Sequence, residues 1–190
     1  MLSQILRFLL DTVFGFFVFV LLARFYLQLL RAPFRNPLGQ FVTALTNWVV
    51  LPARRVIPGM FGLDLASILL AWLIEALLLF LLYVLRGANL GASSGVAVGI
   101  FFTLALLELA RFSLYLLIGV ILIQAVISWV SPYAPLAPLF NALTSPFLRP
   151  FRRMVPPIGN VDLSPLFALL AAQLLLIPLE YLTRSVATLL

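Results

Sequence analysis

The chain has 190 residues, of which 64% are hydrophobic and only 9% are charged, and its mean hydropathy is +1.20. Soluble domains carry about 25% charged residues. A soluble fold of this size could not remove so much apolar surface from water. The composition therefore predicts a membrane protein that crosses the bilayer several times.

Two residue types that serve much of enzyme chemistry are missing. The sequence contains no Cys and no His, and each of its basic residues is Arg. These absences exclude disulfides, thiolate or imidazole metal sites and Schiff-base chemistry. We therefore expect no enzymatic activity, no cofactor and no metal. The net charge of +6 does not predict a nucleic-acid partner, because the arginines flank apolar runs, where positive charge directs membrane topology.

Four apolar runs are long enough to cross the bilayer as helices, which takes about 20 residues. They are Phe8–Leu30, Leu65–Leu85, Val96–Val130 and Pro165–Leu182. The first run is too long for the apolar part of a signal peptide, so we expect a retained span. The third is longer than one crossing needs, and we expect one tilted helix with an N-terminal extension along the interface. The predicted fold is all-α with four transmembrane helices.

Most of the arginines lie in two of the connections between these runs. The connection after the first run and the connection after the third together carry seven of them: Arg31, Arg35, Arg54, Arg55, Arg149, Arg152 and Arg153. Cytoplasmic loops of membrane proteins are enriched in Arg and Lys. We therefore predict that both Arg-rich loops are cytoplasmic and that both termini lie on the opposite side of the membrane.

The two Arg-rich loops are copies of one another, separated by 98 residues without a gap. Matching pairs include Pro37 and Pro135, Thr46 and Thr144, Pro52 and Pro150, Arg54 and Arg152, Arg55 and Arg153, and Asp64 and Asp162. The chain is therefore predicted to be two parallel repeats, each made of a span, an amphipathic loop and a second span. We divide it into repeat one (residues 1–86), a small-residue linker (87–95) and repeat two (96–190).

Each loop contains an apolar stripe with helical spacing. In the first loop the apolar side consists of Leu38, Phe41, Val42, Leu45, Trp48 and Val49, and the opposite, polar side consists of Gln40, Thr43, Thr46 and Asn47. We predict a helix of three turns or fewer that rests its apolar face in the membrane interface. Because proline lacks a backbone donor, Pro52 and Pro150 are expected to end these helices before the Arg-Arg pairs.

The Arg-Arg pairs and the aspartates that follow them are the main candidate site. Arg54, Arg55, Arg152 and Arg153 could bind phospholipid headgroups or an acidic partner, with Asp64 and Asp162 as counter-charges. Alternatively, the arginines only direct topology and the aspartates only cap the next helix. The sequence leaves both interpretations open.

Glu75 is the most unusual residue within a span, because a carboxylate near the middle of the bilayer is unfavourable unless it has a partner. Arg24, in the first span, lies closest to it in depth, and the second repeat has neither charge at the equivalent positions, Leu122 and Gln173. We therefore favour an Arg24–Glu75 pair. A protonated, hydrogen-bonded Glu75 and an ion or proton pathway are the alternatives.

The loop motifs also resemble a known family. The segment 36–67, with its Arg-Arg-Val-Ile-Pro motif at 54–58, and the segment 128–165, with Arg-Pro-Phe-Arg-Arg-Met-Val-Pro-Pro at 149–157, are similar to the YggT family, called YlmG in Gram-positive bacteria and plastids. The resemblance implies a small integral protein of the bacterial inner membrane, of the two-repeat type found in proteobacteria, with no established enzymatic activity. In that membrane, the topology predicted from the arginines puts both termini in the periplasm. It also implies a link to osmotic and ion homeostasis, to division, or to membrane-protein assembly.

Two functions are compatible with these observations. The first is a non-enzymatic inner-membrane protein whose Arg-rich face organises lipid or protein partners, with anionic headgroups as the expected ligand. The second is a homo-oligomeric channel or transporter component in ion or osmotic balance. Polar residues within the spans are few, and this favours the first function because transporters need polar or broken helices within the membrane.

Overall fold

The computed structural model describes residues 1–57, 59, 64–85, 94–131, 133–154 and 162–189. These residues form six helices and contain no strand. The helices are α1 (Leu2–Leu29), α2 (Pro37–Val56), α3 (Leu65–Leu85), α4 (Ser94–Val130), α5 (Ala137–Met154) and α6 (Ser164–Ala187). The prediction of an all-α fold is confirmed.

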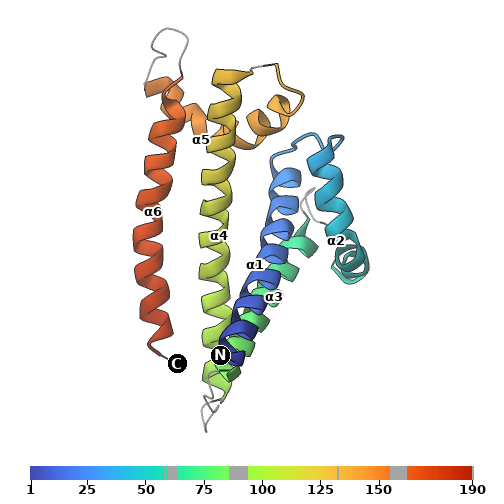
Figure 1. The fold of residues 1–190 in the computed structure, drawn as a ribbon, viewed down its shortest axis with the longest axis vertical. Helices are drawn as coiled ribbons and strands as arrows, with labels where there is room; N and C mark the ends of the chain where they lie inside the picture. Colours follow the sequence, from blue (N-terminus) through green and yellow to red (C-terminus); the bar gives the residue numbers. More distant parts are fainter. Residues whose placement is uncertain (58, 60–63, 86–93, 132, 155–161, 190) are drawn as a thin grey trace.

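The four predicted spans are the four long apolar helices α1, α3, α4 and α6, each long and apolar enough to cross a membrane. The helix α1 begins at Leu2, several residues before the apolar run. The third span is one helix of 37 residues. The expected N-terminal extension is therefore continuous with α4 and does not form a separate interfacial segment (Figure 1).

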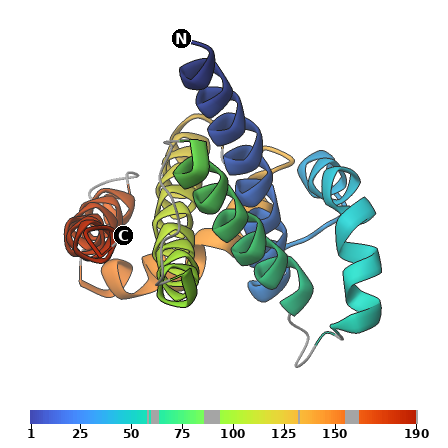
Figure 2. The ribbon, with the colours of Figure 1, turned by 90° about the horizontal axis from the view of Figure 1, so that it is seen from below.

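The spans pack in sequence order, with α1 against α3, α3 against α4 and α4 against α6. Figure 2 shows that the α1–α3 pair is tilted relative to α4 and α6. The chain termini lie at one end of the molecule, and α2 and α5 lie toward the other end (Figure 1). In the largest core cluster, Val18, Leu21 and Leu22 of α1 pack with Val50 of α2 and Ala66 of α3.

The two loop helices are longer than the sequence predicts. The helix α2 has 20 residues and α5 has 18, and Pro52 and Pro150 lie inside them. The expectation that these prolines end the helices is wrong, because a proline removes only one backbone bond and can bend a helix without ending it. The helix α2 is bent part-way along its length (Figure 2). The Arg-Arg pairs therefore form the last turns of α2 and α5, where positive charge stabilises a helix C-terminus.

The polar and apolar faces of α2 are also placed differently from a simple amphipathic helix. The hydroxyl-bearing Thr46 is fully buried, whereas Phe41 and Trp48 are 52% and 70% exposed. The polar Thr46 side chain therefore faces the other helices, and the apolar Phe41 and Trp48 side chains face outward. This arrangement is favourable for a helix whose outer surface contacts lipid. Most of the linker 87–95 lies outside the described residues, so the repeat boundaries stay a prediction.

Candidate functional site

The centre of the candidate site in repeat one is the carboxylate of Asp64, which directly precedes α3. Its side chain is 1% exposed. The Nη2 and Nε atoms of Arg54 donate to its two oxygens at 2.6 and 3.2 Å. The Nε atom of Arg24 donates to Oδ2 at 3.2 Å. Two guanidinium groups, one from α1 and one from α2, thus converge on one buried carboxylate.

Arg24 extends this contact to the polar face of α2. Its Nη1 atom donates to Thr46 Oγ1 at 2.7 Å and to Asn47 Oδ1 at 2.9 Å. Arg24 is 4% exposed, and a buried cation is tolerated only with such paired and hydrogen-bonded surroundings. The Arg24 side chain therefore connects α1, α2 and the start of α3.

Asp64 also begins α3 as a helix cap. Its Oδ1 atom accepts a hydrogen bond from the backbone N–H of Ser67 at 3.3 Å, and its Oδ2 atom accepts one from the Ser67 hydroxyl at 2.7 Å. Burial alone would raise the pKa of Asp64, but hydrogen bonds from Arg54 and Ser67, together with both positive charges, bring the pKa below its ordinary value. The carboxylate is therefore charged at neutral pH. We call Arg24, Thr46, Asn47, Arg54, Asp64 and Ser67 the Asp64 network.

Repeat two contains a smaller version of this arrangement. Arg152 donates from Nε to Asp162 Oδ2 at 2.9 Å, and the two side chains are 42% and 26% exposed. The backbone N–H of Ser164 donates to Asp162 Oδ1 at 2.9 Å. Burial alone would raise the pKa of Asp162, but the bonds from Ser164 and Arg152 bring it below its ordinary value. Among the described residues, Arg152 is the one cation that contacts Asp162.

A different pair of residues connects the span and the loop helix of repeat two. Gln124 of α4 donates from Nε2 to Asn141 Oδ1 of α5 at 2.6 Å. Neither residue matches Arg24 or Asn47 in the repeat alignment, since Leu122 and Ser145 occupy those positions. In both repeats a side-chain hydrogen bond thus joins the first span to the loop helix, but the residues that form it stand at different positions of the repeat.

The two arginines of each pair have different environments. Arg54 and Arg152 contact the aspartate of their own repeat. Their neighbours Arg55 and Arg153 form no ion pair among the described residues, although all four side chains are exposed. We call Arg54, Arg55 and Asp64 the first elbow and Arg152, Arg153 and Asp162 the second elbow. In each elbow, one arginine is paired with the aspartate and the other is exposed.

The structure does not form the expected Arg24–Glu75 pair, and that prediction is wrong. Arg24 is occupied by Asp64, Thr46 and Asn47. Glu75 is buried, and its Oε2 atom has no hydrogen-bond partner among the described residues. Within α4, Glu108 and Arg111 form an ion pair at 2.5 Å, and Glu108 is buried.

Sequence reasoning missed most of the small polar members of the Asp64 network. Thr46, Asn47 and Ser67 are ordinary residues in a sequence, and only the position of Arg24 gives them a role. One signal was available, because Thr46 has an identical match in Thr144 and both are fully buried.

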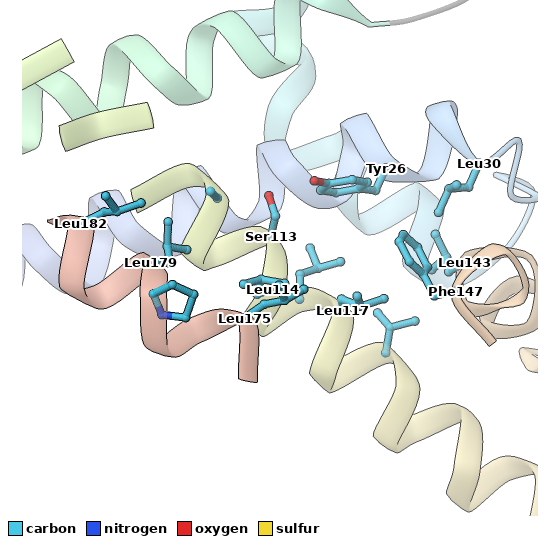
Figure 3. A pocket seen from close by; sticks show the side chains of 14 residues that line it. Tyr26, Leu30, Ser113, Leu114, Leu117, Leu143, Phe147, Leu175, Leu179 and Leu182 are labelled. Carbon is cyan, nitrogen blue, oxygen red and sulfur yellow. The ribbon is translucent and has the colours of Figure 1, made fainter. Parts of the chain in front are cut away.

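A cavity of about 500 Å³ lies between α1, α4, α5 and α6, and Figure 3 shows the side chains that line it. Its lining is apolar apart from Tyr26 and Ser113, and the Ser113 hydroxyl is used within its own helix, where it donates to the Leu109 carbonyl. The lining fits hydrocarbon and not a polar solute. In the part of the chain that the structure describes, no group of three or more acidic residues could hold a metal ion.

Comparison with known proteins agrees with this two-repeat arrangement. The CCB3/YggT family model matches residues 3–85 and again residues 103–183. The chain belongs to this family. A Pseudomonas aeruginosa protein is 40% identical over 175 residues, which cover 88% of this chain and 84% of the relative.

Two further relatives lead to the same assignment. A Vibrio alginolyticus protein encoded in the proC 3′ region is 37% identical over 88% of this chain and 89% of its own length. The Escherichia coli protein YggT is 36% identical over 87% of this chain and 84% of its own length. No solved structure matches the chain. The chain is thus a multi-pass helical membrane protein of the CCB3/YggT family.

Proposed function

We propose that this protein is a non-enzymatic component of the bacterial inner membrane that binds anionic phospholipids at its two elbows. In this way it would organise envelope processes such as osmotic and ion homeostasis, division or membrane-protein assembly. The observation that carries the proposal is that one arginine of each exposed Arg-Arg pair has no acidic partner. Arg54 and Arg152 contact the aspartates, whereas Arg55 and Arg153 form no ion pair among the described residues.

The chemistry of the exposed arginines suits a phosphate ligand. A guanidinium group presents its donors in a planar fork that matches two phosphate oxygens. Arg55 and Arg153 lie in the last turns of α2 and α5. Each such cation contributes about 1 kcal/mol of attraction to an anionic membrane surface. With the exposed Arg31 and Arg149, the two loops offer more positive charge than two aspartates neutralise.

The apolar surface beside the first elbow supports a position at the membrane interface. Trp48, Leu51 and Val56 of α2 are 70%, 53% and 82% exposed. Large exposed apolar side chains next to arginines are typical of helices that lie at the headgroup boundary. Since Arg-rich loops favour the cytoplasmic side, we place both elbows against the inner leaflet and both termini in the periplasm.

The competing function, a channel or transporter component, requires a polar path across the membrane. The cavity between α1, α4, α5 and α6 is apolar and so does not supply such a path. Arg24 and its partners are directed toward one another and hold helices together. These features support the lipid-binding proposal in preference to the channel.

Native mass spectrometry of the protein released from membranes would test the proposal. We expect the double variant Arg55→Ala with Arg153→Ala to lose bound phosphatidylglycerol and cardiolipin while keeping phosphatidylethanolamine. The matched control is Arg7→Ala with Arg184→Ala, which removes two arginines from the helices α1 and α6 near the chain termini. Equal retention of anionic lipid in both double variants would contradict the proposal. If the elbow variant keeps its lipid but loses a crosslinked protein, the ligand of the elbows is a protein partner.

A second double variant separates ligand binding from topology. We expect Arg152→Ala with Arg153→Ala to insert with normal orientation, as reported by thiol labelling of cysteines introduced in the loops, and to lose function in osmotic challenge. An inverted second repeat would instead show that these arginines serve as topology determinants.

A further inference from the structure

The apolar cavity between α1, α4, α5 and α6 is lined by both repeats. Tyr26 and Leu30 belong to repeat one, and the other lining residues belong to α4, α5 and α6 of repeat two. Its volume of about 500 Å³ lies within the range of about 300–1,000 Å³ that is typical of small-molecule sites. The cavity is therefore large enough to hold a ligand between the two repeats.

The length of the cavity matches one leaflet of a bilayer. Along α4 its lining extends from Ala110 to Val120, which is about 15 Å at a rise of about 1.5 Å per residue. The hydrocarbon core of a bilayer is about 30 Å thick, so each leaflet contributes about 15 Å of acyl chain. An acyl chain that lies along α4 is therefore long enough to fill the cavity.

The two ends of the cavity differ in polarity. Figure 3 shows Leu30 and Phe147 near one end of the lining and Leu182 at the other. Tyr26 lies one turn before Leu30, and its hydroxyl makes no hydrogen bond with the other described residues. Arg31 directly follows Leu30, and its side chain is exposed. A free hydroxyl and a cation therefore lie at the end nearest the Arg-rich loops, and the opposite end is apolar.

We propose that this cavity binds one acyl chain of a phospholipid from the leaflet that contacts the elbows. The ester carbonyl at the start of the chain accepts a hydrogen bond from the Tyr26 hydroxyl, the phosphate lies near Arg31, and the chain extends along α4 toward Leu182. The lipid thus fills the space between the two repeats. This proposal goes beyond headgroup binding at Arg55 and Arg153 and does not depend on it.

The shape of the cavity favours an acyl chain over a helix from a second copy of the protein. A spanning helix needs a groove about 30 Å long, whereas the cavity follows α4 for about 15 Å. The helix α5 packs against both α4 and α6, and its residues Leu143 and Phe147 line the cavity. The groove between α4 and α6 is therefore closed by α5 to a second spanning helix.

Photocrosslinking of the full-length protein would test the proposal. The probe is phosphatidylglycerol with a diazirine midway along one acyl chain, incorporated with the protein into lipid nanodiscs. The protein is then exchanged into detergent, which removes loosely associated lipid, and is illuminated. We expect the probe to stay with the wild type and to label residues 110–120 of α4 and 175–182 of α6, as mapped by mass spectrometry of peptides.

Two pairs of variants supply matched controls. Ser113→Phe places a ring in the cavity and should lose the label, whereas Thr103→Phe should keep it. Both hydroxyls donate to the carbonyl four residues earlier in α4, but Thr103 is exposed and does not line the cavity. Tyr26→Phe removes one hydrogen bond and should weaken binding of the probe about two- to tenfold. Tyr115→Phe, on the outer surface of α4, should not weaken it.

Loss of the probe from the wild type during detergent exchange would overturn the proposal, as would equal labelling of Ser113→Phe and Thr103→Phe. If Ser113→Phe does not fold, Ala110→Leu narrows the same cavity and should reduce the label, and an unchanged label would count against the cavity. Since the chain has no Cys, Ser113→Cys introduces a single thiol. A disulfide-linked dimer formed through it in the membrane would assign the cavity to a second copy of the protein.

One further variant separates this site from the elbows. Arg55→Ala with Arg153→Ala should keep the label in the cavity, because neither residue lines it. Loss of the label in that double variant would contradict a separate site. Failure of headgroup binding at the elbows and failure of chain binding in the cavity are thus different results.

Discussion

The two elbows of this protein share nearly the same residues but differ in how deeply they are buried. In repeat one, Asp64 is 1% exposed and receives two arginines. In repeat two, Asp162 is 26% exposed and receives Arg152. The repeats differ at three positions of the Asp64 network, where repeat one has Arg24, Asn47 and Ser67 and repeat two has Leu122, Ser145 and Pro165. The buried Arg24 supplies the second cation of the network, and repeat two has no charge at that position.

The comparison also separates stability from ligand binding. The Asp64 network joins α1, α2 and α3, so repeat one is held together by buried charge. Repeat two relies on Gln124 and Asn141, a neutral pair, for the contact between α4 and α5. Both repeats keep an exposed second arginine. The exposed second arginine, which both repeats have, is therefore the candidate for a function that both repeats share. The buried Asp64 network belongs to repeat one and contributes to its stability.

The largest expected effect comes from removing the buried carboxylate. Asp64→Asn leaves Arg24 buried without a counter-charge, and loss of one partner of a buried pair costs about 3–5 kcal/mol of unfolding free energy. Asp162→Asn breaks a partly exposed pair and should cost about 0–1 kcal/mol. Unfolding of both variants in mixed detergent, followed by circular dichroism, would measure the difference. Equal losses would show that the two elbows are energetically alike.

A smaller effect is expected when repeat one is given the residue of repeat two. Arg24→Leu removes the bonds to Thr46 and Asn47 but leaves Asp64 paired with Arg54, so we expect a loss of about 1–3 kcal/mol. Combined with Glu75→Gln, the losses should add to within about 0.3–0.5 kcal/mol, because the two residues have no partner in common. Recovery of stability in the double variant would instead be evidence for an Arg24–Glu75 pair, which the structure does not form.

The neutral connection of repeat two should contribute less. Gln124→Leu removes the bond to Asn141, and a single hydrogen bond between neutral side chains contributes about 0.5–1.5 kcal/mol. The same detergent unfolding assay would measure this loss, with the exposed Gln173→Leu as control. A loss as large as that of Arg24→Leu would mean that the two connections are equivalent.

The smallest effect is a partial loss of stability in acid. Because the pKa of Asp64 is lowered in the folded protein, its contribution is complete above the unfolded value of about 3.9 and is lost as the pH falls through the folded value. At pH values below about 4, we expect unfolding to need less denaturing detergent than at neutral pH, both in the wild type and in Asp162→Asn. An acid loss that is equally large in Asp64→Asn would assign it to other carboxyl groups.

The sequence by itself determined the architecture of each repeat. Length and hydropathy define α1, α3, α4 and α6, because a span must be apolar over about 20 residues whatever its neighbours are. The pairing of Arg54 with Asp64 and of Arg152 with Asp162 was also accessible, since it appears twice at the same spacing. Local chemistry and repetition were sufficient for these features.

Only the tertiary structure decided which charges meet within the membrane. Depth along a helix, at about 1.5 Å per residue, places Glu75 closer than Asp64 to the level of Arg24. Depth does not give the rotation of a helix, and the packing of α1 against α2 and α3 turns Arg24 toward Asp64. Glu75, further along α3, is buried, and its Oε2 atom has no hydrogen-bond partner among the described residues. The partners of Arg24 come from helices distant in sequence, so no pattern along one span could have identified them.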